Sequence, residues 1–160
     1  RVIGLPGDKV RLIKGKLFIN ESMLIREELS DFIEKKIEQG SMKTVPQCVN
    51  EPVPFGNMNC IKYQSLEKLD NGKSYKILDL GQNIGDDTQD FIIGDNEYFF
   101  LGDNRDNSLD SRFDRQFGGV GLVSKEYLIG KASLILFSSR GSSIFYFWTW
   151  RKDRFFKVIR

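Results

Sequence analysis

The sequence predicts a mostly β protein, and three observations support this fold class. Short apolar runs recur along the chain, turns rich in Gly, Asn and Pro separate them, and only one segment has helical spacing. With 160 residues and 40% hydrophobic composition, the chain can bury one sizeable core but not two independent ones. We therefore expect a single β domain, with at most a subdomain attached.

The chain opens on short strands that form a hairpin. Residues 1–4 read as a strand that runs into the turn Pro6-Gly7-Asp8, and strands at 9–13 and 16–19 flank Lys14-Gly15. The chain thus begins inside a strand, without an initiating Met, and we expect a preceding segment in the complete protein.

The next stretch changes character. Between residues 24 and 39, apolar residues recur at helical spacing among charged ones, which predicts a short amphipathic helix: Leu29, Phe32, Ile33 and Ile37. Residues 40–60 are rich in proline and are predicted to form a long loop. A disulfide between Cys48 and Cys60, suited to an oxidising compartment, and two unrelated thiols are equally compatible with the sequence.

A second hairpin is predicted in the middle of the chain. Strands at 63–69 and 74–80 flank Asp70-Asn71-Gly72, where Asn-Gly supplies the two positive-φ positions of a type I′ turn. Further on, the apolar strand at 98–101 runs directly into the polar segment 102–112.

Composition excludes several classes of function. The chain has 24 Lys and Arg against 22 Asp and Glu, so it lacks the broad basic field of nucleic-acid-binding proteins. It contains no histidine, which excludes Ser-His-Asp and Cys-His catalysis and nearly every catalytic zinc site. Carboxylate, lysine and serine chemistry remain. No apolar run reaches the roughly 18 residues that cross a bilayer.

The segment 102–112, GDNRDNSLDSR, concentrates more charge than a turn requires. If this segment packs against the core, each charged group needs a partner, because unpaired buried charge costs several kcal/mol. We therefore expect a network of ion pairs between Asp103, Asp106 and Asp110 on one side and Arg105 and Arg112 on the other. Asp110 should pair with Arg112, and Asp103 or Asp106 should pair with Arg105 or Arg1.

Two other interpretations of this segment are a solvated surface loop and a calcium-binding loop. The calcium loop requires Gly at its sixth position and Glu at its twelfth. Counted from Asp106, these positions hold Ser111 and Phe117, and counted from Asp103 the third position is Arg105. We expect no metal and no cofactor.

Two segments stand out as motifs: Arg1-Val2-Ile3-Gly4-Leu5-Pro6-Gly7-Asp8 and Gly102-Asp103-Asn104-Arg105-Asp106-Asn107-Ser108-x-Asp110-Ser111-Arg112. The second motif is continued by Phe117-Gly118 and Ile129-Gly130-Lys131-Ala132. In this order, the two motifs resemble the last two signature boxes of type I signal peptidases. The resemblance implies a signal-peptidase-type β-barrel or sheet catalytic core at 1–13 and 96–160. Residues 14–95 would form an inserted β-rich subdomain, which would include the short helix.

The resemblance also implies a mechanism. In this family a serine attacks the scissile carbonyl, and a neutral lysine, whose pKa must lie about 3 below its usual ~10.4, acts as the base. The serine matching Ser108 hydrogen-bonds that lysine, and the position of Leu109, where we expect a smaller residue, lies near the substrate pocket. The lysine precedes the arginine matching Arg1, and the nucleophile lies further upstream. Ser41-Met42 echoes the nucleophile motif but follows the lysine box, so we reject it.

Other consequences of the resemblance concern the surroundings of the site and the partners. The residues expected to support it are Arg1, Gly102, Asp103, Asn104, Arg105, Asp106, Asp110 and Arg112. The expected partners are signal peptides of secreted preproteins and the lipid surface, without nucleic acid. The expected location is the outer, periplasmic face of the bacterial inner membrane. The chain alone is expected to be inactive. A catalytically silent peptide-binding β module is the main alternative, and a self-cleaving Ser/Lys repressor lacks support because no DNA-binding domain is evident.

The last part of the chain alternates apolar runs, at 128–137 and 144–150, with Gly and Ser turns. The second run is aromatic, and cations follow it. Trp148 and Trp150 are therefore expected to contact the membrane interface, while a core strand is an equally open alternative.

Overall fold

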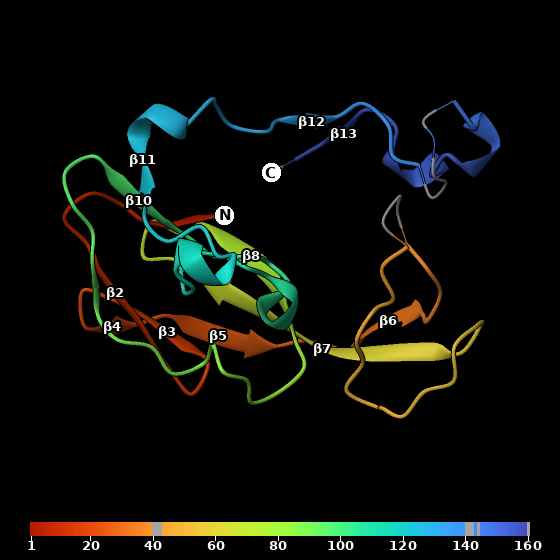
Figure 1. Cartoon of the computed structure of the whole chain (residues 1–160), viewed down its shortest axis with the longest axis horizontal. Coiled ribbons are helices and arrows are strands. Elements are labelled where there is room, and N and C mark those ends of the chain that lie inside the picture. The colour runs from red at the N-terminus through yellow and green to blue at the C-terminus, as the bar shows by residue number, and fades with distance from the viewer. Residues whose placement is uncertain (40–42, 140–142, 144, 160) are drawn as a thin grey trace.

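The computed structural model describes residues 1–39, 43–139, 143 and 145–159, and in these residues it confirms the mostly β class (Figure 1). Thirteen strands and five single-turn 3₁₀ helices are present, with no α-helix in the described ranges. The 3₁₀ helices are η1 (Arg105–Asn107), η2 (Arg115–Phe117), η3 (Lys125–Tyr127), η4 (Phe147–Thr149) and η5 (Lys152–Arg154).

One antiparallel sheet is built around the predicted first hairpin. Its order is β4-β3-β2-β9, formed by β2 (Lys9–Ile13), β3 (Lys16–Ile19), β4 (Ser22–Met23) and β9 (Phe91–Ile92). Lys14 and Gly15 both have positive φ, 49° and 72°, as a two-residue hairpin turn requires. The hairpin prediction is therefore confirmed.

A second sheet is organised by the longest strand, β7 (Asn59–Lys68). One half of β7 pairs with β5 (Ile25–Glu28) and β8 (Ser74–Asp79), and the other half pairs with β6 (Phe32–Lys35). In Figure 1, β7 accordingly extends from the strands near the centre of the molecule to β6 at one end. Cys60, on β7, forms a disulfide with Cys48, with their Cα atoms 5.1 Å apart.

The predicted helix at 24–39 is wrong, because the segment forms β5 and β6. Its apolar residues pair with β7 instead of lining a helix face: Phe32 lies opposite Lys62, and Ile33 lies opposite Ile61. Cross-strand hydrogen bonds to a long central strand outweigh a weak local periodicity.

The second predicted hairpin is confirmed as β7 and β8, but its turn type is not. Only Gly72 has positive φ, 78°, and its N–H donates to the carbonyl of Leu69 at 2.9 Å. Leu69 N–H in turn donates to the carbonyl of Lys73 at 2.8 Å. The longer loop places the left-handed residue at the glycine alone, which removes the need for a left-handed Asn71.

A third sheet joins the two parts of the chain that carry the motifs, since β1 lies within the first motif and β10 directly precedes the second. It has the order β1-β10-β11, formed by β1 (Val2–Gly4), β10 (Glu97–Phe100) and β11 (Val123–Ser124). A separate pair, β12 (Leu134–Ile135) with β13 (Lys157–Val158), lies apart from the other sheets in Figure 1.

Among the described residues, one hydrophobic cluster forms the core, and it includes no residue of β6, β12 or β13. Its buried residues come from several strands and their connections: Ile3, Val10, Leu12, Leu17, Leu24, Tyr75, Ile77, Ile93, Phe99 and Leu101. The core thus draws on residues 1–13, on 14–95 and on the strand before the polar segment. The division into a catalytic core and an inserted subdomain stays a prediction.

The alternative of a core strand at 144–150 is wrong for the described part of that segment. Phe147–Thr149 forms the turn η4, and Phe145 and Trp148 are exposed. Trp150 is half-buried against Phe137, with ring centroids 4.8 Å apart. Ile144 lies outside the described residues.

Candidate active site

The polar segment 102–112 follows β10 and lies against the end of β8. Leu78 N–H donates to the carbonyl of Asp103 at 2.8 Å, and Leu80 N–H donates to Asp106 Oδ2 at 2.5 Å. The segment is therefore tied to the β7–β8 hairpin by backbone groups, and it is not a solvated loop.

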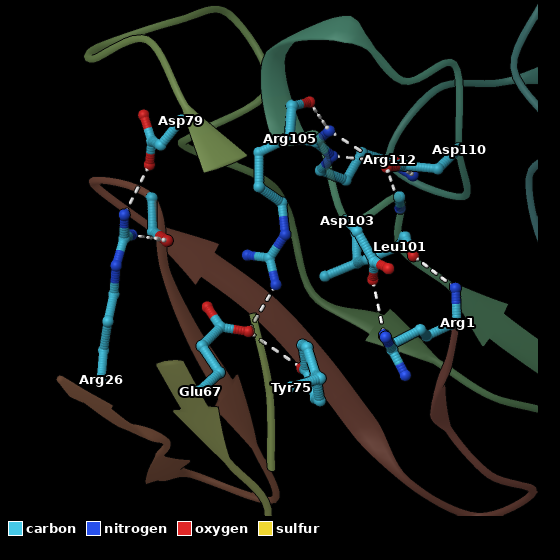
Figure 2. A network of polar contacts seen from close by, with 12 residues as sticks. Arg1, Arg26, Glu67, Tyr75, Asp79, Leu101, Asp103, Arg105, Asp110 and Arg112 are labelled. Atoms are coloured by element: carbon cyan, nitrogen blue, oxygen red, sulfur yellow. Dashed lines mark hydrogen bonds and ion pairs between the residues drawn. The ribbon is translucent and has the colours of Figure 1, made fainter. Parts of the chain in front are cut away.

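Asp110 and Arg112 form a buried ion pair, as expected (Figure 2). Arg112 Nε lies 2.9 Å from Asp110 Oδ1, and their side chains are 1% and 5% exposed. Asp110 also accepts the N–H of Gly102 at 2.9 Å, while Arg112 donates to the carbonyls of Gly85 and Arg105. The pair thus holds both ends of the segment together.

Arg1 and Asp103 form a second expected pair, at 2.6 Å between Nε and Oδ1. The backbone of Arg1 pairs with Leu101: its nitrogen donates to the Leu101 carbonyl at 2.6 Å, and its carbonyl accepts the Leu101 N–H at 3.0 Å. The two motifs are therefore neighbours in space.

The expectation that Arg105 pairs with an aspartate of its own segment is wrong. Its guanidinium lies beneath the segment and donates through NH2 to Glu67 of β7. Asp106 points instead to the backbone of Leu80. Because η1 turns the chain between Arg105 and Asp106, the two side chains serve different neighbours. Sequence reasoning missed Glu67, because nothing in the sequence distinguishes it from the other charged residues of β7, Lys62 and Lys68.

Ser108 packs directly on Gly102. A Cβ added at Gly102 would lie 2.1 Å from Ser108 Oγ, so only glycine fits beneath this hydroxyl. Both residues line a hollow of about 530 Å³, together with Arg1, Phe100, Leu109 and Tyr127. Leu109 is 61% exposed at its rim.

The remaining predicted site residue, Asn104, lies at the N-cap of η1. Its carbonyl accepts the N–H of Asn107 at 3.2 Å, and the residue bridges to Leu78 of β8. All the motif residues expected to support the site thus lie in one connected region. Ser41 and Met42 lie outside the described residues.

Comparison with known proteins shows the family. The sequence model of signal peptidase, peptidase S26, matches residues 1–137. The chain belongs to this family. It is 35% identical over 147 residues to signal peptidase I of Rickettsia bellii (strain OSU 85-389), covering 88% of this chain and 42% of the relative.

Two other members of the family show the same extent of similarity. Signal peptidase I of Rickettsia typhi is 36% identical over 148 residues, covering 88% of this chain and 46% of the relative. The protein of that name from Rickettsia prowazekii is 34% identical, with the same coverage. The chain thus spans under half the length of these relatives. No solved structure matches it.

The described residues of the chain also bear on two structural requirements, those of a metal site and of a membrane-spanning helix. None of them form a group of three or more His, Cys, Asp or Glu side chains that could hold a metal ion. Nor does the described part contain a helix of the length and apolar character needed to span a membrane.

Proposed function

We propose that this chain carries part of the active site of a membrane-associated endopeptidase that removes signal peptides from exported preproteins through a Ser/Lys dyad. The observation that carries the proposal is that Arg1 and Ser108 line one hollow. In the family, a lysine precedes the arginine matching Arg1, so a lysine at that position would lie beside Ser108.

The surroundings of Ser108 suit a base that must stay neutral. A hydroxyl can donate to or accept from an amine without adding the negative charge that would raise the lysine pKa. Two carboxylates of the same segment already have cationic partners, since Asp110 pairs with Arg112 and Asp103 pairs with Arg1. Ser108 would therefore orient the lysine, while the apolar wall formed by Phe100 and Leu101 would favour its uncharged form.

The hollow beside Ser108 would receive the residue that precedes the cleavage site. Leu109, Val120 and Tyr127 contribute an apolar lining. A small uncharged side chain fits such a lining, and Leu109 at the rim would limit its size.

Kinetics of the full-length enzyme test this function. Ser108→Ala should lower kcat for a signal-peptide substrate at least about 10-fold, the usual range for loss of a group that assists the base. Ser74→Ala, at an exposed position of β8, is the matched control and should leave kcat unchanged. Unchanged turnover of Ser108→Ala would remove the role, and a full-length parent that binds but never cleaves the peptide would favour the silent module.

The 160-residue chain alone should not cleave that substrate, because the proposed nucleophile and base are not among its residues. Mass spectrometry of a long incubation checks this point. Cleavage at the signal-peptide site by the purified chain would contradict the proposed assignment of roles.

We also propose that the C-terminal aromatic segment contacts anionic lipid. Trp148 is 68% exposed beside exposed Phe147, and the cations Lys152, Arg154 and Lys157 follow within a few residues. Indole rings favour the headgroup region, and each cation near anionic lipid adds about 1 kcal/mol.

Co-sedimentation with anionic vesicles tests the membrane contact. The parent chain should bind, and a Trp148→Ala/Trp150→Ala variant should bind several times less. Phe55→Ala, at an exposed aromatic outside the C-terminal segment, is the control and should bind like the parent. Equal binding by all three proteins, or no binding by the parent, would exclude the contact.

A further inference from the structure

The buried cation beneath the motif segment depends on a carboxylate from outside the motifs. The side chains of Arg105 and Glu67 are 3% and 1% exposed, and Figure 2 shows them facing each other between η1 and the β7–β8 hairpin. Among the described residues, Glu67 is the one acidic partner of Arg105, whose Nε and NH1 form no hydrogen bond. In the described part of the chain, Glu67 is therefore the one carboxylate in direct contact with the charge of Arg105.

Glu67 is itself held in place by the neighbouring strand. The hydroxyl of Tyr75, its cross-strand partner on β8, donates to Glu67 Oε2 at 2.9 Å. Burial, and then the charge of Glu67, raise the pKa of the Tyr75 hydroxyl, so it remains a neutral donor. The guanidinium carbon of Arg1 lies over the Tyr75 ring, 5.0 Å from the ring centroid. One hairpin thus contacts both motifs.

The turn that Arg105 begins leads directly to Ser108. η1 is only three residues long, and Asn104 gives it no side-chain cap. The turn is instead fixed from two sides, because Arg112 donates to the carbonyl of Arg105 and Glu67 binds its guanidinium. These two anchors, together with the hydrogen bond from Leu80 N–H to Asp106 Oδ2, therefore set the position at which Ser108 leaves the turn.

We propose that Glu67 is a positioning residue for Ser108: through its buried pair with Arg105 it fixes η1, and thereby places the Ser108 hydroxyl over Gly102 in the hollow. This inference rests on the proposed function of Ser108. Without the carboxylate, Arg105 would remain as an uncompensated buried cation, so the turn would have to move to hydrate it. Ser108 would move with the turn.

A double-mutant cycle in the full-length enzyme separates positioning from general destabilisation. Glu67→Gln keeps the size of the side chain and removes its charge. It should lower kcat about 10-fold with little change in KM. In a Ser108→Ala background the same substitution should change kcat by less than about 2-fold, because the hydroxyl that it misplaces is already absent.

Glu34→Gln is the matched control. Glu34 pairs with Lys62 on the same sheet at 2.8 Å, and their side chains are 19% and 5% exposed. This variant should leave kcat unchanged in both backgrounds. An equal loss from Glu67→Gln with and without Ser108 would reduce Glu67 to a structural role and overturn the proposal. If Glu67→Gln does not fold, Tyr75→Phe takes its place, with an expected loss of about 3-fold that again vanishes in Ser108→Ala.

Amide hydrogen exchange of the 160-residue chain provides a test without activity. The Asn107 N–H, bonded to the Asn104 carbonyl, should exchange at least about 10-fold faster in Glu67→Gln than in the parent, and equally in Glu34→Gln and the parent. Unchanged exchange in Glu67→Gln would overturn the inference whether or not the enzyme cleaves signal peptides. A parent enzyme without peptidase activity, combined with faster exchange in Glu67→Gln, would instead refute the proposed function and keep the anchor.

Discussion

Replacing Asp110 by Asn should destabilise the chain strongly. Asp110 accepts hydrogen bonds from the backbone of Gly102 and from Arg112, whose Nε and NH2 lie 2.9 and 3.0 Å from its two oxygens. An amide would turn one donor toward a donor of Arg112 and leave that guanidinium without an anion. Breaking a buried pair in this way costs about 3–5 kcal/mol.

For a domain of this size, such a loss lowers Tm by about 6–20 °C, at 2–4 °C per kcal/mol. Thermal unfolding of the 160-residue chain by circular dichroism measures it. Glu27→Gln is the control, since the pair of Glu27 with Lys68 is exposed and its loss should move Tm by less than about 4 °C. A Tm for Asp110→Asn within 2 °C of the parent would refute the argument that the pair holds the segment.

Three further substitutions test other contacts. Gly102→Ala would place a Cβ 2.4 Å from the Cβ of Ser108, so it should lower Tm by about 2–12 °C and lower kcat of the full-length enzyme, whereas normal values of both would contradict the packing. Leu109→Ala should increase cleavage of substrates with a larger residue before the cleavage site by about 10-fold relative to the parent, and an unchanged preference would place the pocket elsewhere. Cys48→Ala/Cys60→Ala removes the disulfide, whose loop costs about 3 kcal/mol to close in the unfolded chain, so the variant should have a lower Tm than the parent. A Tm that does not fall would show that the loop is held without the disulfide.

Local signals in the sequence predicted both hairpins, although the turn type of the second was wrong. The Lys14-Gly15 and Asp70-Asn71-Gly72 turns lie between strands with alternating residues, so their geometry depends on residues close in sequence. The pairing of Asp110 with Arg112 is similarly local. Asp110 and Arg112 are only two residues apart, so they can pair without any long-range contact, and the sequence argument identified this pair.

Long-range pairing explains the failures. The segment around Phe32 has helical spacing, but it lies beside β7, which the chain reaches only after the 40–60 loop. Arg105 had aspartates on both sides in sequence, yet η1 directs it to Glu67 on a distant strand. Neither the strand pairing of the segment around Phe32 nor the ion pair of Arg105 follows from a local preference. Each depends on the backbone or the charge that lies opposite in the folded sheet.

The three arginines of the motifs differ in what their pairs can contribute. Arg1 and Asp103 are 38% and 50% exposed, so solvent screens this pair and it adds little to stability. Arg105 and Arg112 are almost fully buried, and removing either partner would leave a charge that water cannot reach. Replacing a buried ion pair by apolar residues can be neutral for stability, so stability alone does not account for these two pairs. Their contribution is to orient the polar segment. Both buried pairs meet at Arg105, one turn before Ser108, because Arg112 donates to its carbonyl and Glu67 binds its guanidinium, whereas the exposed pair includes Arg1, next to the position of the proposed base. Under the proposed function, the buried pairs would thus set the place of the Ser108 hydroxyl, and the solvated pair would leave the charge near the proposed lysine screened.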